Sequence, residues 1–272
     1  MPPEITAVIT THGRAESVLD ALASVQAEAH KDLEIVIVDD GGAFAVPPGA
    51  GDSVRVVHGS GLGIARARNL GLAVARGEFV TYLDDDDVAL PNRISSLMSA
   101  ARRHQASLCF GMTRRVVDGA RGSLQDVPTH GISSGEVGFC DVLACNPHVN
   151  SVLVRAETLR AVGGFDTSVD HFDDWAAWLR IADQNAVIRR TTETVAEWRV
   201  HASGLSGRVL QLGAMKRRIL FLFEHLQGCL SKGNAQAVAA AQQVVESCEI
   251  TTYDDYVNAI ATSGVLSGVN VS

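Results

Sequence analysis

Two hydrophobic periods alternate along the first third of the chain. Short apolar runs rich in β-branched residues have the composition of buried strands, and the segments between them carry apolar residues three and four positions apart, as one face of a helix does. The four strand-like runs cover residues 5–10, 33–38, 54–57 and 78–83. Strands separated by helices predict βαβ units, so we expect an α/β, Rossmann-like fold with a mainly parallel central sheet.

The fourth run ends in four consecutive aspartates, at 84–87, and Pro91 then opens a helix with an apolar face. Open α/β sheets bind ligands at the carboxyl ends of their strands. Closely spaced carboxylates raise one another's pKa unless a cation is present, and Mg²⁺ and Mn²⁺ take oxygen ligands of this kind. The pattern therefore indicates a divalent metal. The alternative is a solvated acidic turn that caps the next helix.

The second run ends in another acidic pair, Asp39 and Asp40. Two acidic strand ends in one half of the sheet suggest a nucleotide site. There, Asp39 or Asp40 would accept hydrogen bonds from a base or ribose, Thr10 would contact the same group, and the His12 ring would stack on the base. The alternative for a histidine in a turn is a surface residue without a ligand.

The chain lacks the two common phosphate-binding loops. Neither G-x-G-x-x-G after the first strand nor G-x-x-x-x-G-K-[ST] is present. The phosphates of a nucleotide would therefore be held by the metal, with help from Arg66 or Arg68.

Composition narrows the class of protein. With 272 residues, 46% of them hydrophobic, the chain can form one large domain, or one domain with an appendage. The balance of 23 basic and 31 acidic residues gives a charge of −8, which argues against nucleic acid or an anionic membrane as the main partner. Five scattered cysteines form no C-x-x-C pair and suggest neither disulfides nor zinc. No run is long enough to span a bilayer, so we expect a cytoplasmic protein.

The second half of the chain carries its own acidic pair, Asp173 and Asp174. Trp175 and Trp178 share a helical face just after it, so both aspartates fall in the first turn of a helix, where negative charge is favoured. A helix cap over a tryptophan-filled core is one interpretation, and a catalytic carboxylate is the other.

Four motifs, in the same order and at the same spacing, resemble the inverting family 2 glycosyltransferases of the GT-A fold. T-T-H-G-R at 10–14 stands where the family has P-T-Y-N-R, and I-V-D-D-G-G at 37–42 matches its V-V-D-D-G-S. A-R-N-L-G at 67–71 matches A-R-N-x-G, and 77–87 matches G-E-Y-I-x-F-L-D-x-D-D. His12 and Gly13 stand where the family commonly has an aromatic residue and Asn.

The resemblance implies a role for each matched residue. Asp84 and Asp86 would form the metal-binding Asp-x-Asp element, with Mn²⁺ or Mg²⁺ as the cofactor. Asp40, Thr10 and His12 would lie at the nucleotide base. The full set expected on the nucleotide side is Thr10, His12, Arg14, Asp40, Arg66, Arg68, Asp84 and Asp85.

Two further motifs resemble the acceptor side of the same family. G-G-F-D at 163–166 and D-D-W at 173–175 match G-G-F-D and E-D-W, whose carboxylate is the family's catalytic base. We favour Asp174 as the base, with Asp173 as the alternative, because Asp replaces Glu at the earlier position. W-R-V-H-A-S at 198–203 resembles Y-R-x-H-x-x-S, which implies that His201 completes the metal or diphosphate site.

These roles predict a metal-dependent, inverting transfer of a sugar from a nucleotide-diphospho-sugar to an acceptor hydroxyl. UDP is the nucleotide that the resemblance implies first, with dTDP and GDP as alternatives, and the acceptor would be a small molecule, a glycan or a lipid carrier. Two alternatives remain: a nucleotidyltransferase on a related sheet, and a non-catalytic module that binds a sugar nucleotide or carbohydrate.

The domain organisation follows from the extent of the motifs. We expect a catalytic domain over 1–205, with a nucleotide half to about 105 and an acceptor half after it, and a C-terminal helical extension over 206–272. The extension would pack on the catalytic domain; a homodimer interface or a wall of the acceptor pocket are the alternatives. We expect its basic residues 216–218 to form a solvated face.

Overall fold

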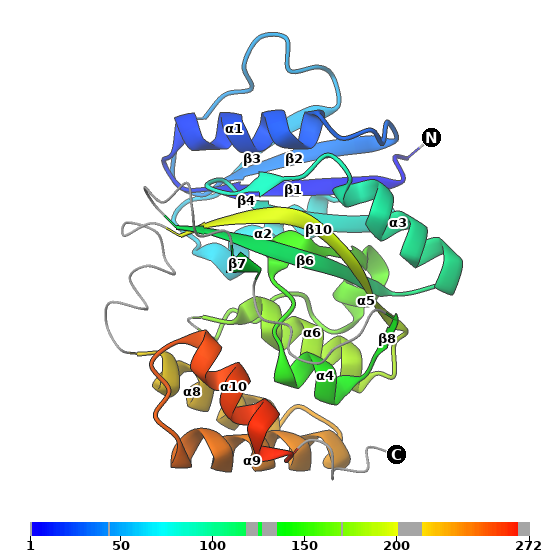
Figure 1. Cartoon of the computed structure of the whole chain (residues 1–272). Coiled ribbons are helices and arrows are strands. Elements are labelled where there is room, and N and C mark those ends of the chain that lie inside the picture. Colours follow the sequence, from blue (N-terminus) through cyan, green and yellow to red (C-terminus); the bar gives the residue numbers. More distant parts are fainter. Residues whose placement is uncertain are drawn as a thin grey trace.

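A computed structural model describes residues 2–42, 44–117, 125–126, 135–169, 171–200 and 214–265. Within these residues, ten strands form one mixed sheet across the middle of the molecule (Figure 1). They are β1 (Ile5–Thr11), β2 (Leu33–Asp39), β3 (Val54–His58), β4 (Phe79–Asp84), β5 (Val88–Ala89), β6 (Leu108–Val117), β7 (Gln125–Asp126), β8 (Gly135–Val137), β9 (Val152–Arg155) and β10 (Ile188–Val200).

Helices cover the sheet and extend below it (Figure 1). Those before the last strand are α1 (Ala15–Gln26), α2 (Ile64–Val74), α3 (Arg93–His104), α4 (Phe139–Ala144), the 3₁₀ turn η1 (Val149–Ser151), α5 (Ala156–Ala161) and α6 (Asp173–Asp183). Those after it are α8 (Met215–Gln227), α9 (Lys232–Ser247) and α10 (Tyr253–Ser263).

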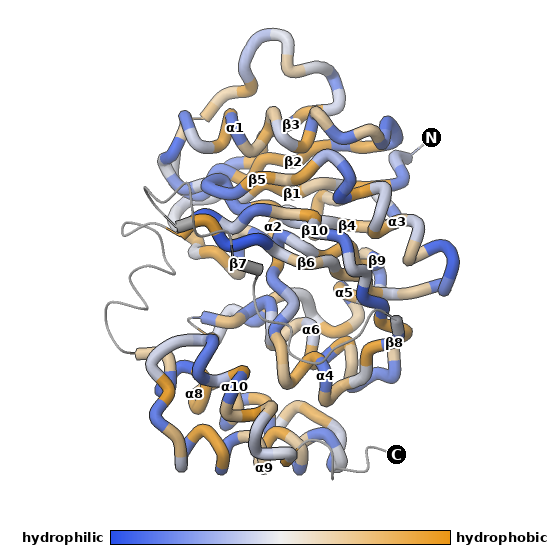
Figure 2. Tube along the Cα trace, viewed as in Figure 1, coloured by the Kyte–Doolittle hydropathy of each residue, from blue (hydrophilic) through white to orange (hydrophobic). Residues whose placement is uncertain are grey.

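The first half of the sheet is parallel, as the sequence predicts. The order β3-β2-β1-β4 joins three parallel pairs. Most residues of these strands are hydrophobic (Figure 2), as expected for a parallel sheet that helices cover on both faces. Ile9 and Ile37 pack in the cluster that α1 completes, whereas Val8 and Val36 pack in the cluster that contains the buried face of α2. This arrangement brings the carboxyl ends of β1, β2 and β4 to one edge.

The second half of the sheet mixes directions. β9 is antiparallel to β4 and β6, and β10 runs parallel to β6. β6 is one continuous strand of 10 residues. The sequence does not predict β10 at all, since its 13 residues are mostly polar and its pairing with β6 is interrupted between Arg190 and Ala196.

The C-terminal helices α9 and α10 pack against α4, and α8 and α10 contact Trp175 of α6, as expected for a helical appendage (Figure 1). The buried Trp175 ring lies 5.6 Å from the Phe223 ring, 5.2 Å from that of Tyr256 and 6.1 Å from that of Tyr253, centroid to centroid. Our prediction of a solvated basic face is wrong for Lys216, whose Nζ donates to the carbonyl oxygens of Glu246 and Cys248. These carbonyls end α9 and attract a cation. No helix in the described ranges is long and apolar enough to cross a membrane.

Candidate active site

A pocket of about 850 Å³ opens at the carboxyl ends of β1, β2 and β4. Thr10, His12 and Asp40 line one end of it, and Asp84, Asp86 and Arg68 line its centre. The opposite end is lined by Asp173 and Asp174 at the start of α6, and by residues of α8 and α10. The two acidic pairs expected from the sequence, 84/86 and 173/174, therefore face one cavity.

A buried amide shapes the aspartate turn after β4. Asn150 is fully buried; its Oδ1 accepts the backbone N–H of Asp84 at 3.0 Å, and its Nδ2 donates to the Asp87 carboxylate. Asp87 also accepts the backbone N–H of Arg199 at 2.7 Å. Burial, together with the charges of Asp84 and Asp86, raises the pKa of Asp87 well above its usual value. Asp87 thus joins β4, η1 and β10 at the pocket wall.

Asp85 is separated from its neighbours. It is buried outside the pocket lining, and its Oδ2 accepts the Thr11 hydroxyl at 2.5 Å and the Arg14 Nε at 3.1 Å. The same guanidinium reaches Asp86 at 2.6 Å through Nη1. Burial raises the pKa of Asp85 to about 6, despite these partners. The structure therefore places Asp85 in an ion pair beside the cavity, and Arg14 at the cavity edge.

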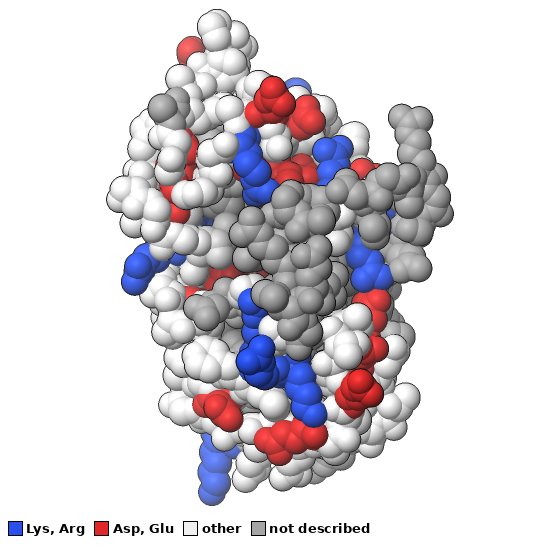
Figure 3. Space-filling model, turned by 90° about the vertical axis from the view of Figure 1, so that its left-hand side faces the viewer, with Lys and Arg blue, Asp and Glu red and all other residues white. Residues whose placement is uncertain are grey.

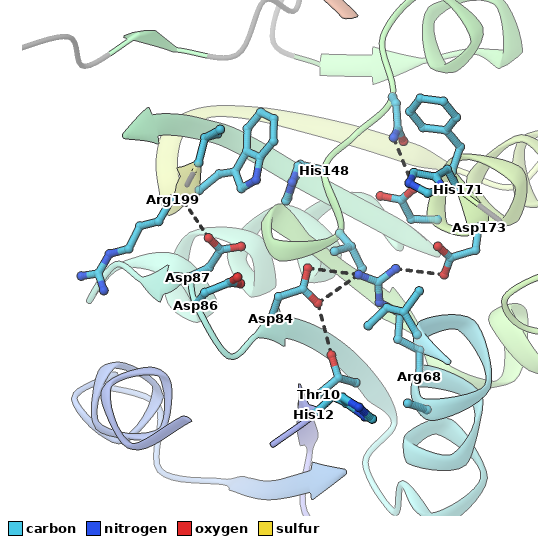
Figure 4. Close-up of a pocket in the computed structure, with 18 of the residues that line it drawn as sticks. Thr10, His12, Arg68, Asp84, Asp86, Asp87, His148, His171, Asp173 and Arg199 are labelled. Carbon is cyan, nitrogen blue, oxygen red and sulfur yellow. Dashed lines mark hydrogen bonds and ion pairs between the residues drawn. The ribbon is translucent and has the colours of Figure 1, made fainter. Parts of the chain in front are cut away.

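Arg68 joins the two acidic pairs (Figure 4). Its Nη1 donates to Asp173 Oδ2 at 2.9 Å, and its Nη2 donates to both Asp84 oxygens, at 3.0 and 3.1 Å. The side chain is buried. Burial opposes ionisation of Asp84, but the adjacent guanidinium outweighs it and holds the pKa of Asp84 below its usual value. Arg66, on the same helix, is exposed and does not line the pocket.

Asp173 and Asp174 differ in their partners. Asp173 carries the Arg68 ion pair, whereas Asp174 Oδ1 accepts the backbone N–H of Trp175 at 2.8 Å and the Asn146 amide at 3.3 Å. Both carboxyls are buried, and burial raises the pKa of each, although Arg68 opposes the shift. Asp174 is therefore held in place by neutral donors and faces the cavity with an elevated proton affinity.

The nucleotide end is organised by Asp40. Its two carboxylate oxygens accept the backbone N–H groups of Leu62, at 2.7 Å, and Gly63, at 2.8 Å, which fixes the loop before α2. The carbonyl oxygen of Asp40 lies 2.5 Å from His12 Nδ1. Thr10 Oγ1 donates to Asp84 at 3.2 Å. Thr10, His12 and Asp40 are thus brought together as expected, but the carboxylate of Asp40 already binds the backbone.

The A-R-N-L-G and G-G-F-D segments interlock. Asn69 accepts the Phe165 N–H at 2.8 Å through Oδ1 and donates to the Phe165 carbonyl at 2.7 Å through Nδ2. Gly164 has φ of 72°, a conformation that favours glycine, and a Cβ there would overlap the Asn69 amide. Phe165 in turn packs edge-on against Tyr82 of β4 at 4.9 Å. This packing holds α2 against the G-G-F-D segment that precedes α6, and so positions Arg68 against Asp173.

Sequence reasoning missed several pocket residues. Asn146 and His148 lie between α4 and β9, in a stretch where no periodicity marks them. His148 lines the pocket with its ring 5.0 Å from that of Trp198, and burial lowers its pKa to about 4, so it is neutral near pH 7. Asn150 lies outside the pocket lining, two residues before β9, and acts on the site through its hydrogen bonds to Asp84 and Asp87.

Asp84 and Asp86 are hard oxygen donors on one cavity wall, and they fit a divalent cation as ligands. Burial is the main cause of the raised pKa of Asp87, and the charges of Asp84 and Asp86 add to it, an effect that a bound cation would oppose. Within the described ranges, no group of three His, Cys, Asp or Glu side chains is arranged to hold a metal. His201, the third expected ligand, lies outside those ranges.

The sheet order, the pocket at its carboxyl edge and the acidic turn define the class of fold as GT-A. Two solved structures show the same fold at low sequence identity. S. aureus TarS 1-349 in complex with UDP-GlcNAc has a TM-score of 0.68 at 15% identity, over 97% of this chain and 81% of that one. The mannosyltransferase PcManGT from Pyrobaculum calidifontis in complex with GDP-Man and Mn²⁺ has a TM-score of 0.59 at 14% identity, over 98% of this chain and 88% of that one.

Residues 6–131 match the family model described as glycosyl transferase family 2, which confirms the resemblance drawn from the four motifs. An uncharacterized glycosyltransferase of Nostoc sp. is 27% identical over 74% of this chain and 66% of its own length. Another, from Rickettsia felis, is 24% identical over 68% of this chain and 31% of its own length. The chain thus spans between 31% and 66% of the length of these curated relatives.

Proposed function

We propose that this chain transfers a sugar from a nucleotide-diphospho-sugar to an acceptor hydroxyl, with inversion at the sugar carbon. The observation that carries the proposal is the Arg68 bridge, because it joins the donor-side Asp84 to the acceptor-side Asp173 in one buried site. UDP is the first candidate for the nucleotide, since TarS 1-349 binds UDP-GlcNAc in the same fold; GDP is the second, after PcManGT. The catalytic domain would cover 1–205.

The donor would lie along β1, β2 and β4. The His12 ring, next to the Asp40 carbonyl, would stack on the base, and Thr10 would contact the base or ribose. Asp40 would act through the backbone, by holding the loop at 62–63 against the nucleotide. Arg14, at the cavity edge, would pair with a phosphate.

Asp84 and Asp86, with His201, would hold a Mn²⁺ or Mg²⁺ ion. When bound, that ion supplies Lewis-acid stabilisation of the diphosphate leaving group. The side chains of Arg68 and Thr10 keep Asp84 ionised and oriented toward the cavity for this purpose.

Asp174 would act as the general base. Its carboxylate takes the proton of the acceptor hydroxyl, as that oxygen forms a bond to the sugar carbon and the bond to the diphosphate breaks on the opposite face. Burial raises its pKa toward the range useful for proton transfer, and Asn146 and the Trp175 N–H fix its orientation. Asp173 is the weaker candidate, because its carboxylate is engaged by Arg68.

A thermal-shift panel tests the donor site. Ligands are UDP, dTDP, GDP and their common sugar conjugates, each with and without Mn²⁺, on wild type, Asp86→Ala and the exposed control Asp52→Ala. A ligand at a hundredfold excess over Kd stabilises the folded state by about 2.7 kcal/mol, which is readily measured. We expect a metal-dependent shift for one nucleotide that Asp86→Ala loses and Asp52→Ala keeps. If no nucleotide shifts the wild type, the proposal fails.

A further inference from the structure

The end of the pocket beyond Asp174 is built partly from the C-terminal helices. Thr252, Tyr253 and Asp254 of the α10 start line it, together with Met215 of α8. Facing them across the cavity is Arg115, near the carboxyl end of β6. The wall is therefore shared between the sheet and the C-terminal extension.

This wall is tied directly to Asp174. The Tyr253 hydroxyl accepts the backbone N–H of Asn146 at 2.5 Å, and the side-chain amide of the same residue donates to Asp174 Oδ1 at 3.3 Å. The Tyr253 ring also packs edge-on against Trp175, which follows Asp174 in the chain. The first turn of α10 thus has a fixed position relative to the proposed base.

An ion pair crosses this end of the cavity. Arg115 Nη2 lies 3.0 Å from Asp254 Oδ2, and the two side chains keep 21% and 32% of their surface exposed. A guanidinium beside a carboxylate presents several donors and acceptors in a plane, which matches the paired hydroxyls of a sugar ring. Phe172 and Tyr253 line the same end and offer flat apolar faces for the C–H face of such a ring.

The charges at this end disfavour an anionic ligand. Among the described lining residues there, Asp173, Asp174 and Asp254 lie beside Arg68 and Arg115, so carboxylates outnumber guanidinium groups. On the face shown in Figure 3, acidic and basic side chains lie side by side, and neither sign dominates. A phosphate would meet several carboxylates, whereas neutral hydroxyls can donate to them.

We propose that β6 and α10 form the acceptor subsite, and that Arg115 and Asp254 there bind the ring hydroxyls of an uncharged glycoside. The inference rests on the proposed function, since Asp174 marks the acceptor end. It assigns the C-terminal extension a part in substrate binding.

Binding of simple glycosides to the UDP-saturated protein with Mg²⁺ tests whether Arg115 and Asp254 form an acceptor subsite. The probes are the methyl glycosides of glucose, galactose, mannose and N-acetylglucosamine, detected by saturation-transfer NMR and titrated for Kd. We expect at least one to bind the wild type, and Arg115→Gln and Asp254→Asn each to weaken it by about tenfold or more, as loss of hydrogen bonds to a charged group does.

The control is Arg189→Gln. Arg189 pairs with Glu136 at the same 3.0 Å and is similarly exposed, at 19%, but it does not line the pocket. The control should bind the glycoside as the wild type does, and all three variants should keep the UDP thermal shift, which shows that they fold and retain the donor site.

Equal glycoside Kd values in the wild type and both pocket variants would overturn the inference. Tighter binding of glucose 1-phosphate than of methyl glucoside would overturn it too, in favour of an anionic acceptor. A thermal shift with UDP but no glycoside binding would contradict the acceptor subsite alone. If no nucleotide gave a thermal shift, the proposed function would fail as well.

Discussion

At the scale of single residues, Arg68 holds the centre of the site. A buried guanidinium is tolerated only with well-placed carboxylates around it, and here Asp84 and Asp173 supply them. The dependence is mutual, because Asp173 would be a buried, uncompensated charge without the arginine, and the half-buried Asp84 would lose its cationic partner. Arg68 thus contributes to folding and to the juxtaposition of the donor and acceptor sides at once.

Arg68→Gln should lower the free energy of unfolding by about 3–5 kcal/mol, as removal of one partner from a buried ion pair does. Urea denaturation measures it. The matched control is Arg66→Gln on the same helix, which is exposed and should change stability by less than about 0.5 kcal/mol. Equal changes in the free energy of unfolding for the two substitutions would show that the ion pairs of Arg68 do not stabilise the fold.

The sequence pointed to the right residue types at this scale but not to their individual partners. Four adjacent aspartates look alike in sequence, yet Asp85 turns toward Arg14 while Asp84 turns toward Arg68. The choice between Arg66 and Arg68 was partly predictable, because residues two apart on a helix point in different directions and one of them alone could enter the cavity.

At the scale of elements, the packing of α2 on β1 determines how deeply the Arg68 side chain is buried. Gly71 permits this approach, since a Cβ there would overlap Cγ1 of Val8 in the strand below. Glycine in the A-R-N-L-G segment therefore serves helix–sheet packing one turn away from the site.

Gly71→Ala should destabilise the protein by about 1–3 kcal/mol through overpacking, and should weaken UDP binding as α2 moves outward. Gly233→Ala is the control: that glycine lies in α9, and nothing lies within 4 Å of the added methyl. It should stabilise the protein by about 0.4–1 kcal/mol, because alanine restricts the unfolded chain. Thermal unfolding compares the two, and a stabilising Gly71→Ala would refute the packing account.

The elements that hydrophobic periodicity marks were predictable, and the others were not. α1 and α3 bury the expected faces, although α3 begins at Arg93, after Pro91. β10 escaped prediction because its stability comes from pairing with β6, about eighty positions earlier, and a single-sequence pattern carries no information on such pairing.

At the scale of the whole molecule, the C-terminal helices complete the core of the second half. Asp166 of the G-G-F-D segment accepts a hydrogen bond from Ser168 and lies 2.8 Å from His225 Nε2 on α8. Burial opposes its ionisation, but these hydrogen bonds outweigh it and lower the pKa of Asp166 to about 2. The contact links the extension to the segment that precedes the proposed base.

A depressed carboxyl pKa predicts the direction of a pH effect. Between pH 4 and 2 the unfolded chain binds a proton at Asp166 that the folded chain does not, so this contribution is present above pH 4 and is lost as the pH falls. We expect about 1 kcal/mol after solvent screening, and a shallower loss of stability in Asp166→Asn than in wild type. The exposed Asp20→Asn serves as control, and identical acid titrations of stability for all three proteins would contradict the link.

The pocket could not be assembled from the sequence at this scale. Its contacts join residues far apart in the chain, such as Arg115 with Asp254, which only the three-dimensional fold brings together. The motif resemblance supplied the donor carboxylates and the acceptor-side pair, whereas the wall from α10 lies beyond the matched motifs.

The most direct test of the account is the turnover of Asp174→Asn. UDP release is measured from the UDP-sugar that gives the largest thermal shift, with a bound methyl glycoside as acceptor, for wild type, Asp174→Asn and Asp20→Asn. The account predicts that Asp174→Asn keeps the UDP shift and loses turnover by about 10²–10⁴-fold, as removal of a general base does, while Asp20→Asn matches the wild type. Wild-type turnover in Asp174→Asn would contradict the assignment of the base.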